Sequence, residues 1–131
     1  MNVVDSSGWL EYFGRGANGA FFAPVIQASA QLVVPTISMY EVYKHIALQA
    51  DEEEALSAIA WMTVGRVADL TQEIALTAAD LSMEYKLPMA DSIILATARA
   101  HHATLWTQDE HFKDLPDVKY VEKWSGQGRS S

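Results

Sequence analysis

Apolar residues along this chain recur at two spacings, one typical of short buried strands and the other typical of amphipathic helices. Compact apolar runs bounded by polar or turn-forming residues predict strands at about 2–5, 32–34, 66–70, 103–106 and 118–121. Apolar residues three or four positions apart predict helices at about 9–13, 20–30, 39–49, 55–64, 72–85 and 90–101. A single helical turn is expected at about 110–114.

This alternation of strands and helices predicts an α/β protein of three layers, in which helices cover both faces of a parallel sheet of four or five strands. The chain has 131 residues, of which 50% are apolar, so a single domain can bury a core of ordinary size. We assign residues 1–123 to this domain. Residues 124–131 are polar and rich in Gly and Ser, which is typical of a flexible C-terminal tail.

Two of the predicted helices carry apolar stripes that are expected to face the core. In the helix predicted at 55–64 the stripe consists of Leu56, Ile59, Ala60 and Met62. In the helix predicted at 72–85 it consists of Ile74, Ala75, Ala78, Leu81 and Tyr85. Asp51 and Thr71 precede these helices as expected N-caps.

Acidic residues also stand at the start of other helices, where each has a purely structural explanation. Asp5 ends the first strand and can cap the helix that follows. Asp91 lies in the first turn after Pro88, where the helix dipole favours a negative charge. The segment from Ser38 to Glu41 has the form of a capping box, in which Glu41 would reach back to the Ser38 backbone N–H.

The positions of these acids in the predicted sheet favour a second interpretation. Asp5 and Asp109 follow the carboxyl ends of strands, whereas Glu41 and Asp91 open helices. In a parallel sheet all four fall at the carboxyl edge, where α/β proteins bind ligands. Two carboxylates about 4 Å apart repel by about 4 kcal/mol at an effective dielectric constant of about 20, so such a cluster needs protons or cations.

Oxygen donors of this kind suit Mg²⁺ or Mn²⁺, whereas zinc usually recruits His or Cys. The chain contains no cysteine, and its histidines lack zinc-motif spacing, so we expect them at the surface rather than as ligands. These histidines are His45, His101, His102 and His111.

Composition narrows the choice of partners and compartment. A net charge of −8 argues against broad, sequence-independent binding of nucleic acid through a basic surface, although it permits an acidic site whose metal ions meet a phosphate. The sequence has no signal-peptide pattern and no apolar run of bilayer length. We therefore expect a cytoplasmic protein that does not enter a membrane.

Four motifs give the chain a resemblance to a known family over nearly its whole length. They are Val4-Asp5-Ser-Ser, Ser38-Met-Tyr-Glu41, Leu87-Pro-Met-Ala-Asp91-Ser-Ile-Ile-Leu-Ala-Thr-Ala and Leu105-Trp-Thr107-Gln-Asp109-Glu-His-Phe. With these motifs the chain resembles the PIN-domain ribonucleases, and most closely the VapC-like toxins of toxin–antitoxin pairs. The third and fourth motifs together are specific, whereas the first two are weak alone.

The resemblance implies a PIN-like fold and Mg²⁺- or Mn²⁺-dependent endonucleolytic cleavage of RNA by a metal-activated water. Asp5, Glu41, Asp91 and Asp109 then correspond to the catalytic, metal-binding acids. Thr107 corresponds to the supporting hydroxyl residue, and Ser6 has a smaller supporting role.

The chain departs from the family pattern where the helix after Asp91 ends. His102 stands where a Gly is common, and we expect it to adopt a left-handed backbone conformation at some cost.

The resemblance also implies protein partners, namely a VapB-like antitoxin and a second copy of the chain in a homodimer. A groove over the first helices would receive the antitoxin, and Trp9, Tyr12 and Phe13 are candidate contact residues if they are exposed. An acidic chain suits a basic antitoxin segment, because an Arg can form paired hydrogen bonds with carboxylates. Candidate basic residues for guiding RNA are Arg15, Lys44, Lys86, Arg99 and Lys113.

Other functions explain the sequence less well. A haloacid-dehalogenase-type phosphatase needs an Asp two residues after Asp5, where this chain has Ser7. A receiver domain needs an acidic pair near its first strand and a later Lys, and this pattern is absent from the sequence. A catalytically inert PIN-fold module that binds a protein or ribonucleoprotein partner is the remaining alternative.

Overall fold

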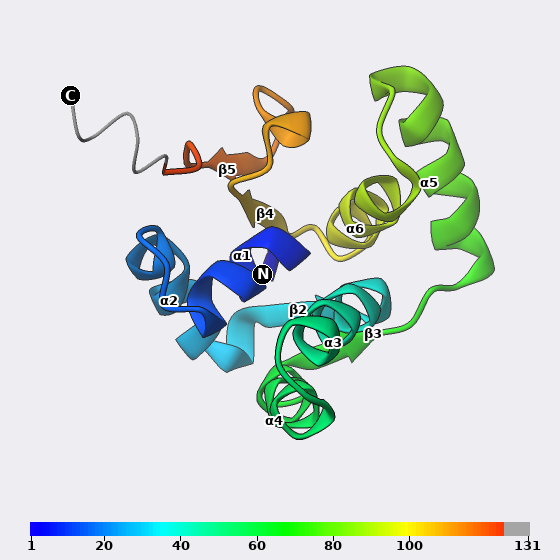
Figure 1. Cartoon of the computed structure of the whole chain (residues 1–131). Helices are drawn as coiled ribbons and strands as arrows, with labels where there is room; N and C mark the ends of the chain where they lie inside the picture. Colours follow the sequence, from blue (N-terminus) through cyan, green and yellow to red (C-terminus); the bar gives the residue numbers. More distant parts are fainter. Residues whose placement is uncertain (125–131) are drawn as a thin grey trace.

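The computed structural model describes residues 1–124 and contains a five-stranded sheet in which every neighbouring pair of strands is parallel (Figure 1). The strands are β1 (Asn2–Val4), β2 (Leu32–Pro35), β3 (Arg66–Ala68), β4 (Thr104–Thr107) and β5 (Val118–Tyr120). The predicted α/β class and parallel sheet are thus confirmed. Most of the predicted tail, residues 125–131, lies outside the described part of the chain.

The longer connections between strands are helical, as the hydrophobic spacing predicts. The α-helices are α1 (Ser6–Phe13), α2 (Gly19–Gln27), α3 (Thr36–Gln49), α4 (Glu52–Met62), α5 (Gln72–Tyr85) and α6 (Met89–Ala100). Two short 3₁₀ turns, Ser29–Gln31 and Glu110–Phe112, complete the chain up to β5.

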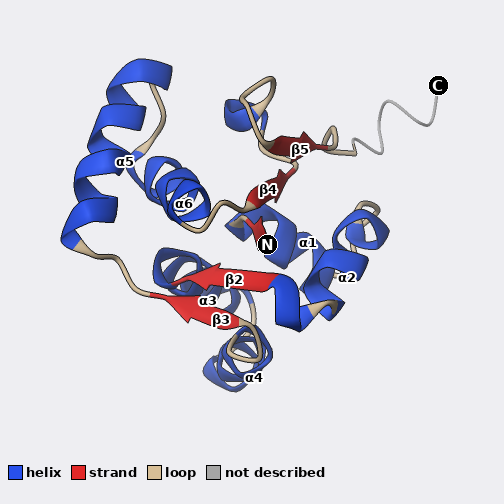
Figure 2. Cartoon of the chain, turned by 180° about the vertical axis from the view of Figure 1, so that it is seen from behind, coloured by secondary structure: helices blue, strands red, loops and turns tan. Residues whose placement is uncertain are grey.

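Alternate residues of the strands point into two separate hydrophobic cores. Val3, Val33 and Leu105 pack on one face of the sheet together with α5 and α6. Val4 and Val34 pack on the other face, against apolar residues of α1 to α4. Figure 2 shows α5 and α6 side by side on one flank of the sheet, with α1 and α2 on the other. This arrangement gives the three layers expected from the sequence.

The strand order β3-β2-β1-β4-β5 places β1 and β4 next to each other at the centre of the sheet. From β1 the chain first builds outward through β2 and β3, and then returns to add β4 and β5 on the other side of β1. The segment after β1 packs on the face that holds Val4, whereas Phe112, after β4, packs on the face that holds Val3. At such a point of an α/β sheet a crevice opens at the carboxyl ends of the two strands. Asp5 and Asp109 follow these two strands.

Gly8 allows α1 to approach the sheet closely. A Cβ at this position would lie 2.6 Å from Val4 Cγ1 and 2.7 Å from Phe22 Cε1, so any larger residue would push the helix away. Because Asp5 caps α1, the position of this helix also determines the position of the Asp5 carboxylate.

The buried residues of α4 and α5 differ in part from those that the sequence predicts. Leu56 and Ala60 are exposed, whereas Ala55, Ala58 and Met62 are the buried residues of α4. Small residues on the buried face let α4 approach α3 closely, and this rotates Leu56 to the outside. In α5 the predicted stripe is confirmed except for Ala75, which is exposed.

Local backbone predictions at helix ends are largely confirmed. Asp51 accepts the backbone N–H of Glu54, and Thr71 accepts that of Ile74. His102 has a φ of 51°, which is the left-handed conformation expected after α6. Within residues 1–124, no helix combines the length and apolar character needed to cross a bilayer.

Candidate functional site

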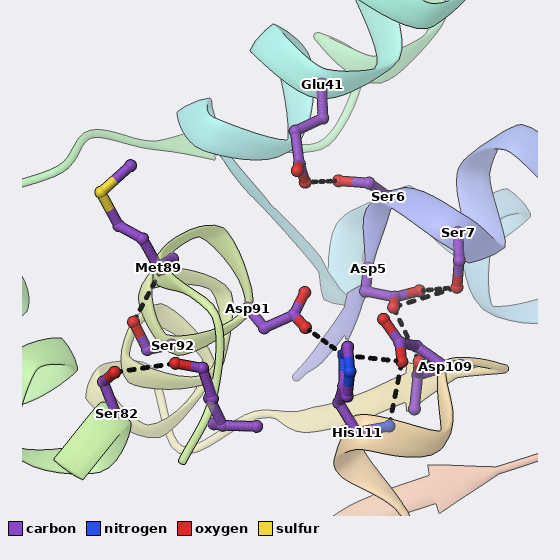
Figure 3. A network of polar contacts seen from close by, with 12 residues as sticks. Asp5, Ser6, Ser7, Glu41, Ser82, Met89, Asp91, Ser92, Asp109 and His111 are labelled. Atoms are coloured by element: carbon purple, nitrogen blue, oxygen red, sulfur yellow. Dashed lines mark hydrogen bonds and ion pairs between the residues drawn. The ribbon is translucent and has the colours of Figure 1, made fainter.

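Asp5 is held by hydrogen bonds at the carboxyl end of β1. Its carboxylate accepts the Ser7 hydroxyl at 2.8 Å (Figure 3). It also accepts the Gly8 backbone N–H at 2.9 Å, so it caps α1 as the sequence predicts. Asp5 is only 2% exposed. Burial raises its pKa to about 6 from 3.8, against the opposing effect of hydrogen bonds from Thr107, Gly8 and Ser7.

Thr107, the last residue of β4, links Asp5 to Asp109. Its hydroxyl donates to Asp5 Oδ2 at 2.7 Å and accepts the Asp109 backbone N–H at 2.8 Å. The side chain of Thr107 is fully buried, so this bridge is shielded from water. One hydroxyl thus positions one predicted acid directly and orients the backbone of the next.

Asp91 and Asp109 approach each other from α6 and from the turn after β4. His111 Nδ1 lies between them, 2.9 Å from Asp91 Oδ2 and 3.1 Å from Asp109 Oδ1 (Figure 3). Burial raises the pKa of Asp91, as does the negative charge of Asp109, whereas His111 lowers it. The hydrogen bond to Asp91 and the nearby Asp109 raise the pKa of His111.

Glu41 lies in the second turn of α3 rather than in a capping box, which corrects one of the structural explanations for it. The helix begins at Thr36, three residues before the predicted start at Met39, so Ser38 is its third residue rather than its N-cap and Glu41 stands beyond the first turn. The Glu41 carboxylate instead accepts the Ser6 hydroxyl at 2.6 Å. The negative charge of Glu41 also raises the pKa of Asp91, so Glu41 lies near Asp91 in the crevice.

The donor set of this crevice fits a divalent cation. One carboxylate oxygen each from Asp91 and Asp109 and one nitrogen of His111 lie within 4.8 Å of one another. Asp109 raises the pKa values of both Asp5 and Asp91, so the acids repel one another and a cation would relieve this repulsion.

Sequence reasoning missed two residues that shape the crevice. His111 is exposed, as expected, but the short turn after Asp109 also brings its ring back onto the acids. Gln108 is 5% exposed and accepts a hydrogen bond from Asn18 Nδ2 at 2.9 Å, which anchors the segment between Thr107 and Asp109. The proximity of His111 to Asp109 in sequence was the only available signal for the first of these residues.

The candidate partner residues on α1 do not share one environment. Trp9 is 1% exposed and stacks on Phe13, so its ring belongs to the core, which corrects its assignment as a candidate surface contact. Phe13 lines an apolar groove of about 400 Å³ with Leu10, Ile46 and Trp61. Tyr12 lines a different hollow, beside Ile26 and Gly65.

Several of the candidate basic residues lie over aromatic rings. The Lys44 ammonium is 5.7 Å from the centroid of Tyr40, and the Arg99 guanidinium is 5.6 Å from that of Tyr85. Lys113 lies 5.8 Å from the centroid of Tyr120. A further Lys, Lys123, lines a hollow of about 500 Å³ together with Asp109, His111 and Tyr120.

Comparisons with known proteins agree with the observed fold. A model of the PIN domain family matches residues 3–118. A chain from a toxin–antitoxin complex of Klebsiella pneumoniae is similar in structure, with a TM-score of 0.77 and 26% identity over 94% of this chain and 100% of that chain. No curated protein matches the sequence.

More distant solved structures share the fold. FitAcB from Neisseria gonorrhoeae has a TM-score of 0.71 and 18% identity, over 93% of this chain and 97% of that chain. VapC20 from Mycobacterium tuberculosis, a toxin that cleaves the sarcin-ricin loop, has a TM-score of 0.69 and 16% identity, over 86% of this chain and 92% of its own.

Proposed function

We propose that this chain, which belongs to the PIN-domain family, is a Mg²⁺- or Mn²⁺-dependent endoribonuclease and the toxin of a toxin–antitoxin pair. The observation that carries the proposal is the convergence of Asp91 and Asp109 on one point of the crevice, beside Asp5 and Glu41.

In this proposal the four acids hold the cation and the hydroxyl residues hold the acids. Asp91 and Asp109 present carboxylate oxygens to the crevice, and Glu41 and Asp5 add negative charge close to them. Thr107 and Ser6 each donate a hydrogen bond to an acid and thereby limit its rotation. A bound divalent cation would supply a polarised water for attack and offset charge on the scissile phosphate.

RNA as the substrate is supported by the similarity to VapC20, a toxin that cleaves the sarcin-ricin loop, and by the hollow next to Asp109. Lys123 and the ring of Tyr120 line this hollow beside the acids Asp109, Glu110 and Glu122, and Lys113 lies over the same ring. A Lys beside an aromatic ring can hold a phosphate while a base stacks on the ring.

An antitoxin partner is supported by the toxin–antitoxin complex among the similar structures and by the groove that Phe13 lines. The groove has an apolar lining and lies beside the acidic start of α4, where Asp51, Glu52, Glu53 and Glu54 follow one another. A segment with apolar and basic residues would complement this surface.

We also propose a homodimer. Exposed Tyr40, Leu48 and Leu56 line a second apolar groove between α3 and α4, and such contiguous apolar surface is uncommon on monomers. Light scattering on the purified chain measures this directly, and a single monomeric species would contradict it.

The test of the nuclease function is cleavage of end-labelled RNA by the purified chain with Mg²⁺, with Mn²⁺ and with EDTA. We expect cleavage only with a divalent ion and its loss in Asp91→Asn. Since water attacks, the products should lack a 2′,3′-cyclic phosphate, which a contaminating metal-independent ribonuclease would leave. If every RNA stays intact while a small partner protein still binds, the chain is an inert binding module instead.

A further inference from the structure

His111 presents a nitrogen atom to the same point as the two carboxylates. Its Nδ1 lies 2.9 Å from Asp91 Oδ2 and 3.1 Å from Asp109 Oδ1, whereas the side chain as a whole is 52% exposed. Figure 3 shows the imidazole ring directed at both acids from the turn after β4. In this position the ring gives up rotamer freedom that a side chain extended into solvent would keep.

The backbone around His111 holds the ring in this place. Asp109 caps the turn Glu110–Phe112 by accepting the His111 backbone N–H at 2.9 Å. Phe112, the next residue, is fully buried and fastens the turn to the core. Asp109 is itself tied to Thr107 through its backbone N–H. The turn therefore delivers one carboxylate and one imidazole to the crevice as a unit.

We propose that His111 is a ligand of the metal ion held by Asp91 and Asp109, and that it makes the site prefer Mn²⁺ or Co²⁺ to Mg²⁺. The inference rests on the proposed metal-dependent function. The chemical reason is that imidazole nitrogen binds first-row transition ions well, whereas Mg²⁺ prefers oxygen ligands and retains its waters. A site of carboxylates alone would show this preference more weakly.

The competing role for His111 is that of an internal counter-ion, whose ring must leave before a metal binds. The two roles predict opposite effects of removing the ring. Loss of a ligand weakens metal binding, and most of all for transition ions. Loss of a counter-ion strengthens the binding of every divalent ion, because nothing then competes for the carboxylates.

The experiment is calorimetric titration of the whole chain with Mn²⁺, Co²⁺ and Mg²⁺, for the wild type and for His111→Ala. The variant keeps the backbone N–H that Asp109 accepts, so the turn should persist. We expect the Kd for Mn²⁺ and Co²⁺ to rise at least about tenfold, with a smaller change for Mg²⁺. His102→Asn is the matched control, since this exposed histidine lies beyond the opposite end of α6 from Asp91 and Asn tolerates its left-handed backbone.

Pulsed electron paramagnetic resonance of bound Mn²⁺ gives an independent readout. A ¹⁴N coupling should be present in the wild type and in His102→Asn, and missing in His111→Ala. If His111→Ala fails to fold, His111→Gln serves the same comparison, since its amide group is a poor substitute for an imidazole ligand. Unchanged or tighter binding in the variant, or no ¹⁴N coupling in the wild type, would overturn the proposal.

Asp91→Asn separates this inference from the function on which it rests. If Asp91→Asn loses metal binding and His111→Ala does not, the acidic site stands and only the role of His111 is wrong. If Asp91→Asn binds metal as well as the wild type, the proposed metal site itself is wrong.

Discussion

Asp5 and Asp91 are the same kind of side chain at the same edge of the sheet, but their surroundings differ. Asp5 is 2% exposed and accepts hydrogen bonds from a backbone N–H and two hydroxyls, whereas Asp91 keeps a partly exposed carboxylate whose partner is His111. The oxygens of Asp5 are thus largely engaged by the protein, while those of Asp91 are open to a ligand. The crevice therefore has an inner side that is held rigidly and an outer side that can exchange partners.

The largest expected effect is on RNA cleavage and concerns Asp91, on the outer side of the crevice. Asp91→Asn should lower the rate of RNA cleavage at least about 100-fold, because it removes a charged oxygen donor from the proposed metal site. It should not lower the melting temperature, since Asp91 and Asp109 repel each other. Initial rates with Mn²⁺ and circular dichroism measure the two effects. Asp80→Asn, an exposed acid on α5, is the control, and wild-type turnover in Asp91→Asn would rule out the assignment.

The next effect is on stability and concerns Asp5, on the inner side of the crevice, and it depends on pH. The folded protein binds the Asp5 proton more tightly than the unfolded chain does, because the pKa of Asp5 is raised from 3.8 to about 6. Binding of this proton therefore stabilises the folded state fully below pH 3.8, and this stabilisation is lost as the pH rises to about 6.

Asp5→Asn removes this ionisation. The variant should gain stability relative to the wild type across the same window, by at most about 3 kcal/mol. Urea unfolding in EDTA at several pH values measures the difference. A difference between the two proteins that does not change with pH would show that burial of the Asp5 charge has no such cost.

Thr107→Val tests the hydroxyl that joins the Asp5 carboxylate to the Asp109 backbone N–H. Valine has the shape of threonine but leaves the buried Asp5 carboxylate and the Asp109 N–H each without one partner, which should cost about 1–3 kcal/mol of stability. Thr63→Val, which removes an exposed hydroxyl bonded to Ala60, is the matched control and should change stability much less. Equal losses in the two variants would mean that the bridge adds nothing.

The smallest effect on stability is expected for Glu41→Gln. Glutamine can still accept the Ser6 hydroxyl, so the free energy of unfolding should change by less than about 0.5 kcal/mol. Cleavage should nevertheless fall at least about tenfold if the Glu41 charge serves the metal. If cleavage depends instead on the hydrogen bond from Ser6, Ser6→Ala should lower the cleavage rate by as much as Glu41→Gln does, or by more.

The sequence by itself determined the features that depend on neighbouring residues. Asp51 and Thr71 cap helices because a side-chain oxygen can reach a backbone N–H a few residues along, and His102 adopts its turn for equally local reasons. The order of elements follows from hydrophobic spacing, and in a parallel sheet that order places Asp5 and Asp109 at one edge.

Only the tertiary structure decided which faces of the helices are buried and which side chains complete the crevice. Trp9 is buried and Leu56 is exposed because the packing of helices on the sheet and on each other sets their rotation, and no local pattern encodes it. Glu41 pairs with Ser6, 35 positions away, rather than with Ser38. His111 meets Asp91 across 20 positions because α6 and the turn after β4 converge, and such a contact arises only when the sheet is assembled.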